Sequence, residues 1–305
     1  MFADRLMESI KKKGNPSVLG LDPRPGMIPR CIRDVHGEDL GRAVFEFNKA
    51  LIDAVADLVP AVKLQIAFYE ALGLEGLRAY RETADYAKER GLLVIGDIKR
   101  GDISSTAEAY RDAHLFGHFR CDAVTLNPFL GYDSVEPFLK ACSRDGKGVF
   151  ILVKTSNPSS GDLQNLKVGD EYLYQYLAGK VAEWGRDLLG KYGYSSVGAV
   201  VGATYPGELK VLRRIMPHTP LLLPGYGAQG AGGRDVAAAF DDKGLGAVVN
   251  SSRALAGAYL RAEKPECVTV EEFKKYTRDE ALRMRDDITN AIKNRDINVQ
   301  GECQS

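Results

Sequence analysis

The sequence lacks the features that mark several classes of protein. Lysine plus arginine number 41, as do aspartate plus glutamate, so the formal net charge over 305 residues is zero. No basic stripe indicates a nucleic-acid partner. The apolar runs are short, none approaches the length of a membrane span, and the N-terminus lacks the apolar core of a signal peptide. We therefore expect a cytoplasmic protein that binds neither nucleic acid nor membrane.

Residues that bind metals or form disulfides are also scarce. The five cysteines include no CxxC pair, which argues against a zinc site and a disulfide framework. The four histidines include no HExxH motif. His114 and His118 are four residues apart in a predicted helix, and no third ligand accompanies them. We interpret them as two exposed helical side chains, and we expect neither a metal nor a cofactor.

The sequence does contain a regular alternation of strand and helix patterns. Near-continuous apolar runs bounded by turn residues are typical of parallel strands that are covered on both faces. Eight such runs, most of them followed by a helical pattern, predict a (β/α)8 TIM barrel of the α/β class, with a doubly wound open sheet as the alternative. The runs are residues 17–21, 61–65, 92–95, 123–126, 149–153, 198–202, 221–223 and 246–249.

Two regions exceed a minimal barrel, although we expect residues 1–305 to form a single domain. An insertion at about 157–195 begins with flexible residues and becomes helical, and long connections of this kind are often lids. A charged C-terminal extension at about 270–305 is predicted to be helical. Its candidate packing residues are Phe273, Leu282, Met284 and Ile288.

A charged cluster, Asp97 to Asp102, follows the third apolar run. Side chains alternate across a strand, so Asp97 and Lys99 should share one face. We expect Asp102 in the turn that follows, and the spacing of Ser105 and Glu108 predicts a capping box for the next helix. Taken alone, the cluster is as compatible with a surface ion pair as with a functional site.

Polar residues at other strand ends favour a functional site, because chemistry in such barrels occurs at the carboxyl ends of the strands. Lys63 lies within an apolar run, where an unpaired lysine would lose its proton or destabilise the strand. Asp97, on the adjacent strand, is its candidate partner. The polar residues at the predicted strand ends are Asp22, Lys63, Asp97, Lys99, Asp102, Asn127, Lys154, Ser156, Gln229 and Arg253.

A second constellation indicates a phosphate site. The glycine-rich residues 224–233 follow the seventh run, and Asn250 to Arg253 end the eighth run and open a helix. Loops after the seventh and eighth strands, with a helix N-terminus, are the usual phosphate site of these barrels. Arginine supplies a planar double donor for phosphate oxygens. No GxxxxGK[ST] motif is present, which argues against a P-loop nucleotide hydrolase.

Together these residues resemble the orotidine 5′-phosphate decarboxylase family, in its longer-chain, type 2 subgroup. The most specific element is the DxKxxD signature from Asp97 to Asp102, which related barrels acting on sugar phosphates share. The accompanying residues narrow the resemblance. They are Leu21-Asp22-Pro23, Lys63, Thr155-Ser156-Asn157-Pro158, and residues 224–230 with Arg253.

The resemblance implies an activity and an assembly. It implies cofactor-free and metal-free decarboxylation of orotidine 5′-phosphate to uridine 5′-phosphate in de novo pyrimidine biosynthesis. Lys99 would donate the proton, Asp97 would face the departing carboxylate, and Lys63 would complete the charged set. A homodimer with shared active sites is implied, in which Asp102 serves the partner's site with Ile103 and Thr106 beside it.

The resemblance also implies the contacts that hold the substrate. Asp22 and Lys63 would hold the ribose, Ser156 the pyrimidine, and Gln229 and Arg253 the phosphate, with Ser252 as a further binding residue. Two alternatives stay open. One is a magnesium-dependent sugar-phosphate decarboxylase or synthase of the same barrel group, and the other is a non-catalytic nucleotide-binding protein.

Overall fold

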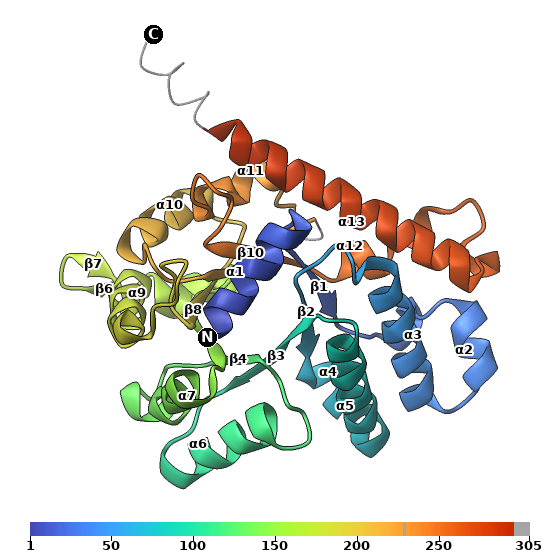
Figure 1. Cartoon of the computed structure of the whole chain (residues 1–305), viewed down its shortest axis with the longest axis horizontal. Coiled ribbons are helices and arrows are strands. Elements are labelled where there is room, and N and C mark those ends of the chain that lie inside the picture. Colours follow the sequence, from blue (N-terminus) through green and yellow to red (C-terminus); the bar gives the residue numbers. More distant parts are fainter. Residues whose placement is uncertain (228–229, 296–305) are drawn as a thin grey trace.

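The computed structural model describes residues 1–227 and 230–295 (Figure 1). Eight parallel strands close into a barrel in the order β1-β10-β9-β8-β5-β4-β3-β2. The predicted barrel is therefore confirmed, and the open sheet is excluded. The strands are β1 Ser17–Leu21, β2 Ala61–Gln65, β3 Leu93–Arg100, β4 Ala123–Leu126, β5 Gly148–Lys154, β8 Val197–Val201, β9 Leu221–Pro224 and β10 Ala247–Ser251.

Helices surround the strands as an outer layer (Figure 1). Strand side chains alternate between this layer and the barrel interior. Val62, Val94 and Val124 belong to the core between strands and helices, whereas Ile95 and Phe150 belong to the interior core. The helices are α1 Phe2–Lys13, α2 Arg30–His36, α3 Leu40–Val55, α4 Ile66–Glu70, α5 Gly73–Glu89, α6 Ser104–Arg111, α7 Tyr132–Asp145, α8 Gly161–Gln164, α9 Leu173–Trp184, α10 Pro206–Ile215, α11 Gly233–Val236, α12 Arg253–Ala256 and α13 Val270–Lys293.

The N-terminal helix α1, which the sequence analysis did not predict, covers one end of the barrel (Figure 1). Its buried side chains Phe2, Leu6 and Ile10 join the interior core. The Phe2 ring meets the Phe150 ring edge-on, with 6.0 Å between centroids. Because Phe150 lies near the start of β5, α1 covers the amino ends of the strands. The opposite end, where the strands finish, is left for a site.

The connection between β5 and β8 carries the expected helix, α9, and a short hairpin that was not predicted. The hairpin pairs β6 Lys167–Val168 with β7 Glu171–Tyr172. The preceding segment folds back on β5, because Gln164 accepts a 3.0 Å hydrogen bond from the Thr155 N–H and donates a 2.8 Å bond to the Thr155 hydroxyl. Whether this segment moves as a lid stays a prediction.

Two local expectations were wrong. The helix after β3 begins at Ser104, with Ile103 at the N-cap position and no side-chain cap among the described residues. Ser105 thus lies inside the first turn, where its hydroxyl cannot cap. His114 is buried against the Phe119 ring in a π-helical turn, and this burial lowers the pKa of His114 to about 4. Of this pair, His118 alone is exposed, and it lies in a bend after that turn.

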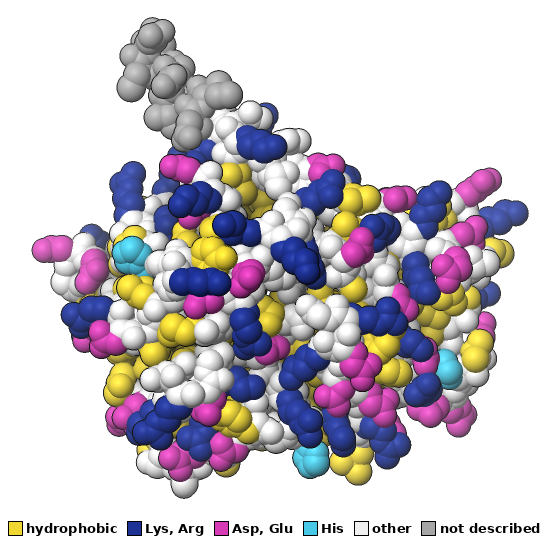
Figure 2. Space-filling model, in the orientation of Figure 1, with side chains coloured by type: hydrophobic (Ala, Val, Ile, Leu, Met, Phe, Trp, Pro, Cys, Tyr) yellow, Lys and Arg dark blue, Asp and Glu magenta, His cyan; other side chains and the backbone are white. Residues whose placement is uncertain are grey.

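Charges of both signs are interspersed over the face of the molecule in Figure 2, in keeping with the zero net charge. Within the part of the chain that the structure describes, no helix is long and apolar enough to cross a membrane. No group of three or more histidine, cysteine, aspartate or glutamate side chains among those residues could hold a metal ion.

Candidate active site

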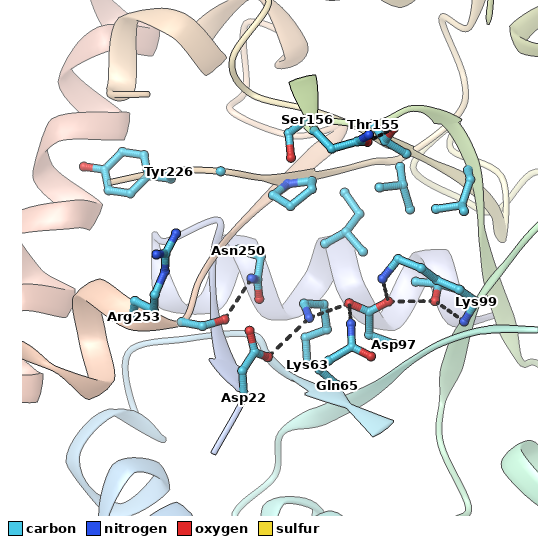
Figure 3. A pocket seen from close by; sticks show the side chains of 18 of the residues that line it. Asp22, Lys63, Gln65, Asp97, Lys99, Thr155, Ser156, Tyr226, Asn250 and Arg253 are labelled. Atoms are coloured by element: carbon cyan, nitrogen blue, oxygen red, sulfur yellow. Dashed lines mark hydrogen bonds and ion pairs between the residues drawn. The ribbon is translucent and has the colours of Figure 1, made fainter. Parts of the chain in front are cut away.

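A cavity of about 550 Å³ opens at the carboxyl ends of the strands (Figure 3). Parallel strands bring residues that are distant in sequence to this end, and the size suits a small-molecule ligand. Seven of the site residues that the sequence predicted line the cavity. They are Asp22, Lys63, Asp97, Lys99, Ser156, Ser252 and Arg253.

Asp97 lies at the centre of a hydrogen-bonded network. Its Oδ1 accepts a 2.5 Å bond from Lys99 Nζ and a 2.9 Å bond from the Thr125 hydroxyl. Its Oδ2 accepts a 2.7 Å bond from Lys63 Nζ and a 2.9 Å bond from Gln65 Nε2. The Asp97 residue is only 6% exposed. Four donors therefore hold one carboxylate in a fixed orientation, which is how a buried charge is made tolerable.

The two buried charges keep each other ionised. Burial alone would lower the pKa of Lys63, but the carboxylates of Asp97 and Asp22, the latter 3.7 Å away, raise it above the ordinary lysine value. Burial alone would raise the pKa of Asp97, but Lys63 and Lys99 hold it well below the usual aspartate range. At neutral pH the cavity therefore presents a chain of alternating charge.

Asp97 and Lys99 of β3 point to the same side of the strand, as predicted, but a distortion of the backbone contributes to this arrangement. Asp97 and Lys99 line the cavity, whereas Ile98 packs in the outer core. Lys99 has a φ of 48°, in the left-handed region that side chains rarely adopt, and the β3–β4 register shifts between Gly96 and Arg100. The Lys99 N–H donates a 3.0 Å bond to the Thr125 hydroxyl at this distortion. Strain of this kind is characteristic of functional positions.

The loops after β9 and β10 form another part of the cavity wall. Ser252 and Arg253 stand at the start of α12, and Asn250 Nδ2 donates a 3.3 Å bond to Ser252 Oγ. A Cβ on Gly20 would lie 1.9 Å from Ser252 Oγ, so only glycine lets β1 approach this turn so closely. The predicted Gln229 lies outside the described residues.

Other predicted residues are not brought into this cavity. Asp102, Ile103 and Thr106 are not among the described residues that line it. Asp102 Oδ1 instead accepts a 2.8 Å bond from the Ile103 N–H, and Ile103 and Thr106 are exposed. Lys154 is buried and is not among the described residues that line the cavity, and its Nζ donates a 2.6 Å bond to Asn165. Asn127 accepts a bond from the Phe129 N–H and shapes the turn after β4.

Two residues that were not predicted from the sequence, Gln65 and Thr125, both donate to Asp97. Arg24, which also lines the cavity, was not predicted either, whereas Asn250 belongs to the predicted phosphate constellation and lines the cavity as well. A signal was present for the first two of these residues. Gln65 lies two residues after Lys63 and so shares its strand face, and Thr125 is the polar residue of an apolar run.

Known proteins resemble the chain over most of its length. A family model described as "Orotidine 5'-phosphate decarboxylase / HUMPS family" matches residues 19–266 of the chain. The chain belongs to this family. Curated orotidine 5′-phosphate decarboxylases resemble it over nearly their whole length. That of Petrotoga mobilis is 47% identical over 290 residues, covering 94% of this chain and 98% of the relative. That of Clostridium kluyveri is 44% identical, covering 97% and 99%.

Two solved structures from Leishmania donovani are also similar to the chain. The OMP decarboxylase of Leishmania donovani superposes with a TM-score of 0.72 at 34% identity, covering 93% of this chain and 98% of its own. The UMP synthase of the same organism gives a TM-score of 0.76 at 35% identity and covers 95% of this chain. This chain spans 56% of the UMP synthase.

Replacing Asp97 with asparagine should destabilise the fold and change its acid sensitivity. Lys63 and Lys99 would lose the negative carboxylate that lies between them, which should lower the free energy of unfolding by about 3 kcal/mol at pH 7. Because folding depresses the pKa of Asp97, its contribution is present above the unfolded value of about 3.9 and is lost as the pH falls below it. The stability difference between wild type and Asp97→Asn should therefore shrink toward pH 3.

Denaturant unfolding at neutral and acidic pH measures this difference. Asp286→Asn, an exposed carboxylate on α13, is the matched control and should change stability little at either pH. A deficit in Asp97→Asn that is as large at pH 3 as at pH 7 would contradict the assigned ionisation.

Proposed function

We propose that this chain decarboxylates orotidine 5′-phosphate to uridine 5′-phosphate in de novo pyrimidine biosynthesis, with Lys99 as proton donor and without metal or cofactor. Membership of the family and identities of 43–47% to curated decarboxylases support the activity. The observation that carries the mechanism is the 2.5 Å contact of Lys99 Nζ with the buried Asp97 carboxylate. A nucleotide-binding protein has little need for such a proton donor.

The reaction breaks the bond between the ring carbon and its carboxylate. The electron pair stays on the ring carbon as carbon dioxide leaves, and the Lys99 ammonium then gives that carbon a proton. Asp97 lies beside the departing carboxylate, and its Oδ1 holds the Lys99 ammonium in place through the 2.5 Å hydrogen bond. A unit-charge pair at about 4 Å contributes roughly 4 kcal/mol at an effective dielectric near 20. Enzymes lower barriers by about 8 to 23 kcal/mol, so Lys99 accounts for only part.

Binding of the remote parts of the substrate supplies the rest of the barrier reduction. Asp22 and Lys63 hold the ribose hydroxyls, and Ser156 contacts the pyrimidine. Arg253 binds the phosphate together with Ser252 and Gln229. Closure of the segment after β5 over the ligand would exclude water and align the charges. The position of Asp22, Lys63, Ser156 and Arg253 on one cavity supports this arrangement.

The active site is shared between two copies of the chain. Three residues follow the carboxyl end of β3 without lining the cavity of their own chain, namely Asp102, Ile103 and Thr106. A residue that completes the active site of a partner chain is expected to lie in this way. Large apolar side chains are exposed nearby, after β3 and β4. They are Ile103 at 49%, Phe129 at 84%, Leu130 at 49% and Tyr132 at 48% exposure. A second copy that covers this surface would bury them and bring Asp102 to its own cavity. The cytoplasmic location stays a prediction.

The test of the function is the loss of orotidine 5′-phosphate absorbance with purified protein and excess chelator. Steady turnover is expected, because none of the proposed steps uses a metal. Lys99→Ala protein purified in the same way controls for a contaminating host enzyme. Turnover that requires added magnesium would favour the sugar-phosphate enzymes of this barrel group. Tight binding of uridine 5′-phosphate without turnover would favour a non-catalytic protein.

A further inference from the structure

The C-terminal helix α13 presents polar side chains, as well as apolar ones, to the barrel. Phe273, Met284 and Ile288 are buried, as packing alone would require. Thr277 and Glu280 are buried as well, and Asp287, three residues after Met284, lies at the exposed edge of the same face. All three make hydrogen bonds to residues that follow β9 or β10. Figure 1 shows α13 running along the outside of the barrel from α11 to α3.

Asp287 holds the loop that follows β9. Its Oδ2 accepts a 2.7 Å bond from the Tyr226 hydroxyl and a 2.7 Å bond from the Gly233 N–H. Figure 3 shows the Tyr226 hydroxyl pointing away from Lys63 and Asp97. Tyr226 is 3% exposed, and a Cβ on Gly233 would meet the Asp287 carbonyl oxygen at 2.5 Å. The helix and the loop are therefore fitted closely at this point.

The other two polar residues hold the segment that follows β10. The Thr277 hydroxyl donates a 3.3 Å bond to the Leu255 carbonyl of α12, the helix that Arg253 begins. Glu280 is 3% exposed and accepts a 2.7 Å bond from Arg261 and a 2.5 Å bond from Arg283. Burial opposes its ionisation, but the two arginines lower the pKa of Glu280. A buried polar group that must meet its partner sets the register of a helix.

We propose that α13 positions the phosphate end of the active site and that Asp287 is the positioning residue for the loop after β9. Asp287 acts through Tyr226 and Gly233 and does not touch the substrate. Tyr226 lies between Gly225 and Gly227, which both have positive φ, and ordering such a flexible segment costs conformational entropy. The bond to Asp287 orders Tyr226 before the ligand arrives, so ligand binding does not have to overcome this cost. This inference rests on the proposed phosphate site.

The experiment compares the affinity for uridine 5′-phosphate with that for uridine in Asp287→Ala. The variant leaves the Tyr226 hydroxyl and the Gly233 N–H without their acceptor. We expect the affinity for uridine 5′-phosphate to fall about three- to tenfold and the affinity for uridine to fall less than about twofold. Asp287→Asn should retain most of the affinity, because its amide oxygen can accept both bonds. Tyr226→Phe should also lower the ratio of the affinity for uridine 5′-phosphate to the affinity for uridine. In the double variant with Asp287→Ala, this ratio should fall by less than the two single effects combined, because both substitutions remove the same bond.

Two matched controls separate positioning from stability. Asp286→Ala removes the neighbouring carboxylate of α13, which is exposed like Asp287 but accepts its side-chain bond from Arg285 rather than from the loop after β9. Arg278→Ala removes the bonds that hold α13 against the C-terminal end of α3. These are a 3.0 Å bond to the Ala54 carbonyl and 2.7 Å bonds to each carboxylate oxygen of Asp57. Both should leave the affinity ratio unchanged. If Asp287→Ala lowers thermal stability as Arg278→Ala does and leaves the ratio unchanged, the positioning role is wrong.

Arg253→Ala distinguishes failure of this inference from failure of the proposed site. A selective loss of uridine 5′-phosphate binding in Arg253→Ala, with no selective loss in Asp287→Ala, would overturn the role of Asp287 alone. Equal losses of both ligands in Arg253→Ala would remove Arg253 from the phosphate site and the inference with it. Selective losses in both variants would support both.

Discussion

Lys99→Ala should lower kcat by at least about 10⁴-fold while uridine 5′-phosphate still binds. The variant loses both the proton donor and the cation nearest the developing carbanion. Asp97 keeps Lys63, Gln65 and Thr125 as donors, so the cavity should persist. The loss should therefore fall on kcat rather than on product affinity, because Lys99 acts on the reacting carbon and not on the phosphate or ribose.

Steady-state kinetics and titration with uridine 5′-phosphate measure the two quantities. Lys140→Ala, which removes a lysine paired with Glu136 on the surface of α7, is the control and should leave kcat unchanged. Turnover within about tenfold of wild type in Lys99→Ala would remove Lys99 from the role of proton donor.

Asp102→Ala should also be inactive alone, yet mixing it with Lys99→Ala should restore activity. In a dimer with shared sites, each mixed dimer contains one site with Lys99 from one chain and Asp102 from the other. The second site of that dimer carries both substitutions. Random exchange at equal concentration makes half the dimers mixed, so the expected recovery is about a quarter of the wild-type activity.

Differently tagged chains allow the mixed dimers to be isolated before the assay, so that the exchange of chains between dimers is verified directly. Each variant mixed with itself is the control and should stay inactive. Verified mixed dimers without activity would place Asp102 in the site of its own chain or outside any site. A monomeric wild-type protein that is fully active would contradict sharing altogether.

Local sequence patterns predicted most of the barrel because burial on both faces of a parallel strand leaves a local mark. The run from Ala123 to Leu126 matches β4 residue for residue. The third run fell short, since β3 continues to Arg100 through charged residues that carry no apolar signal. His114 was misjudged for a related reason, because its burial depends on Phe119 and on packing rather than on helical spacing.

The candidate site divides in the same way between sequence and structure. The position of Lys63 within an apolar run predicted that it needs a carboxylate partner. The pairing of β2 with β3 places Asp97 there, with 2.7 Å between Lys63 Nζ and Asp97 Oδ2. The roles of Gln65 and Thr125 as further donors depend on strand register, which periodicity does not specify. For the C-terminal extension, the sequence predicted a helix and its packing residues. It could not predict that Asp287 meets Tyr226, a residue 61 positions away.

The sequence by itself determined the eight strands of the barrel and the polar residues at their ends, because apolar runs and the residues that end them are local patterns. The tertiary structure decided which of those residues share a cavity and which do not. It grouped Asp22, Lys63, Asp97, Lys99 and Arg253 and left Asp102 outside. The physical reason is that closing the barrel sets the register between neighbouring strands, and the register decides which side chains are close enough to share a proton or a charge.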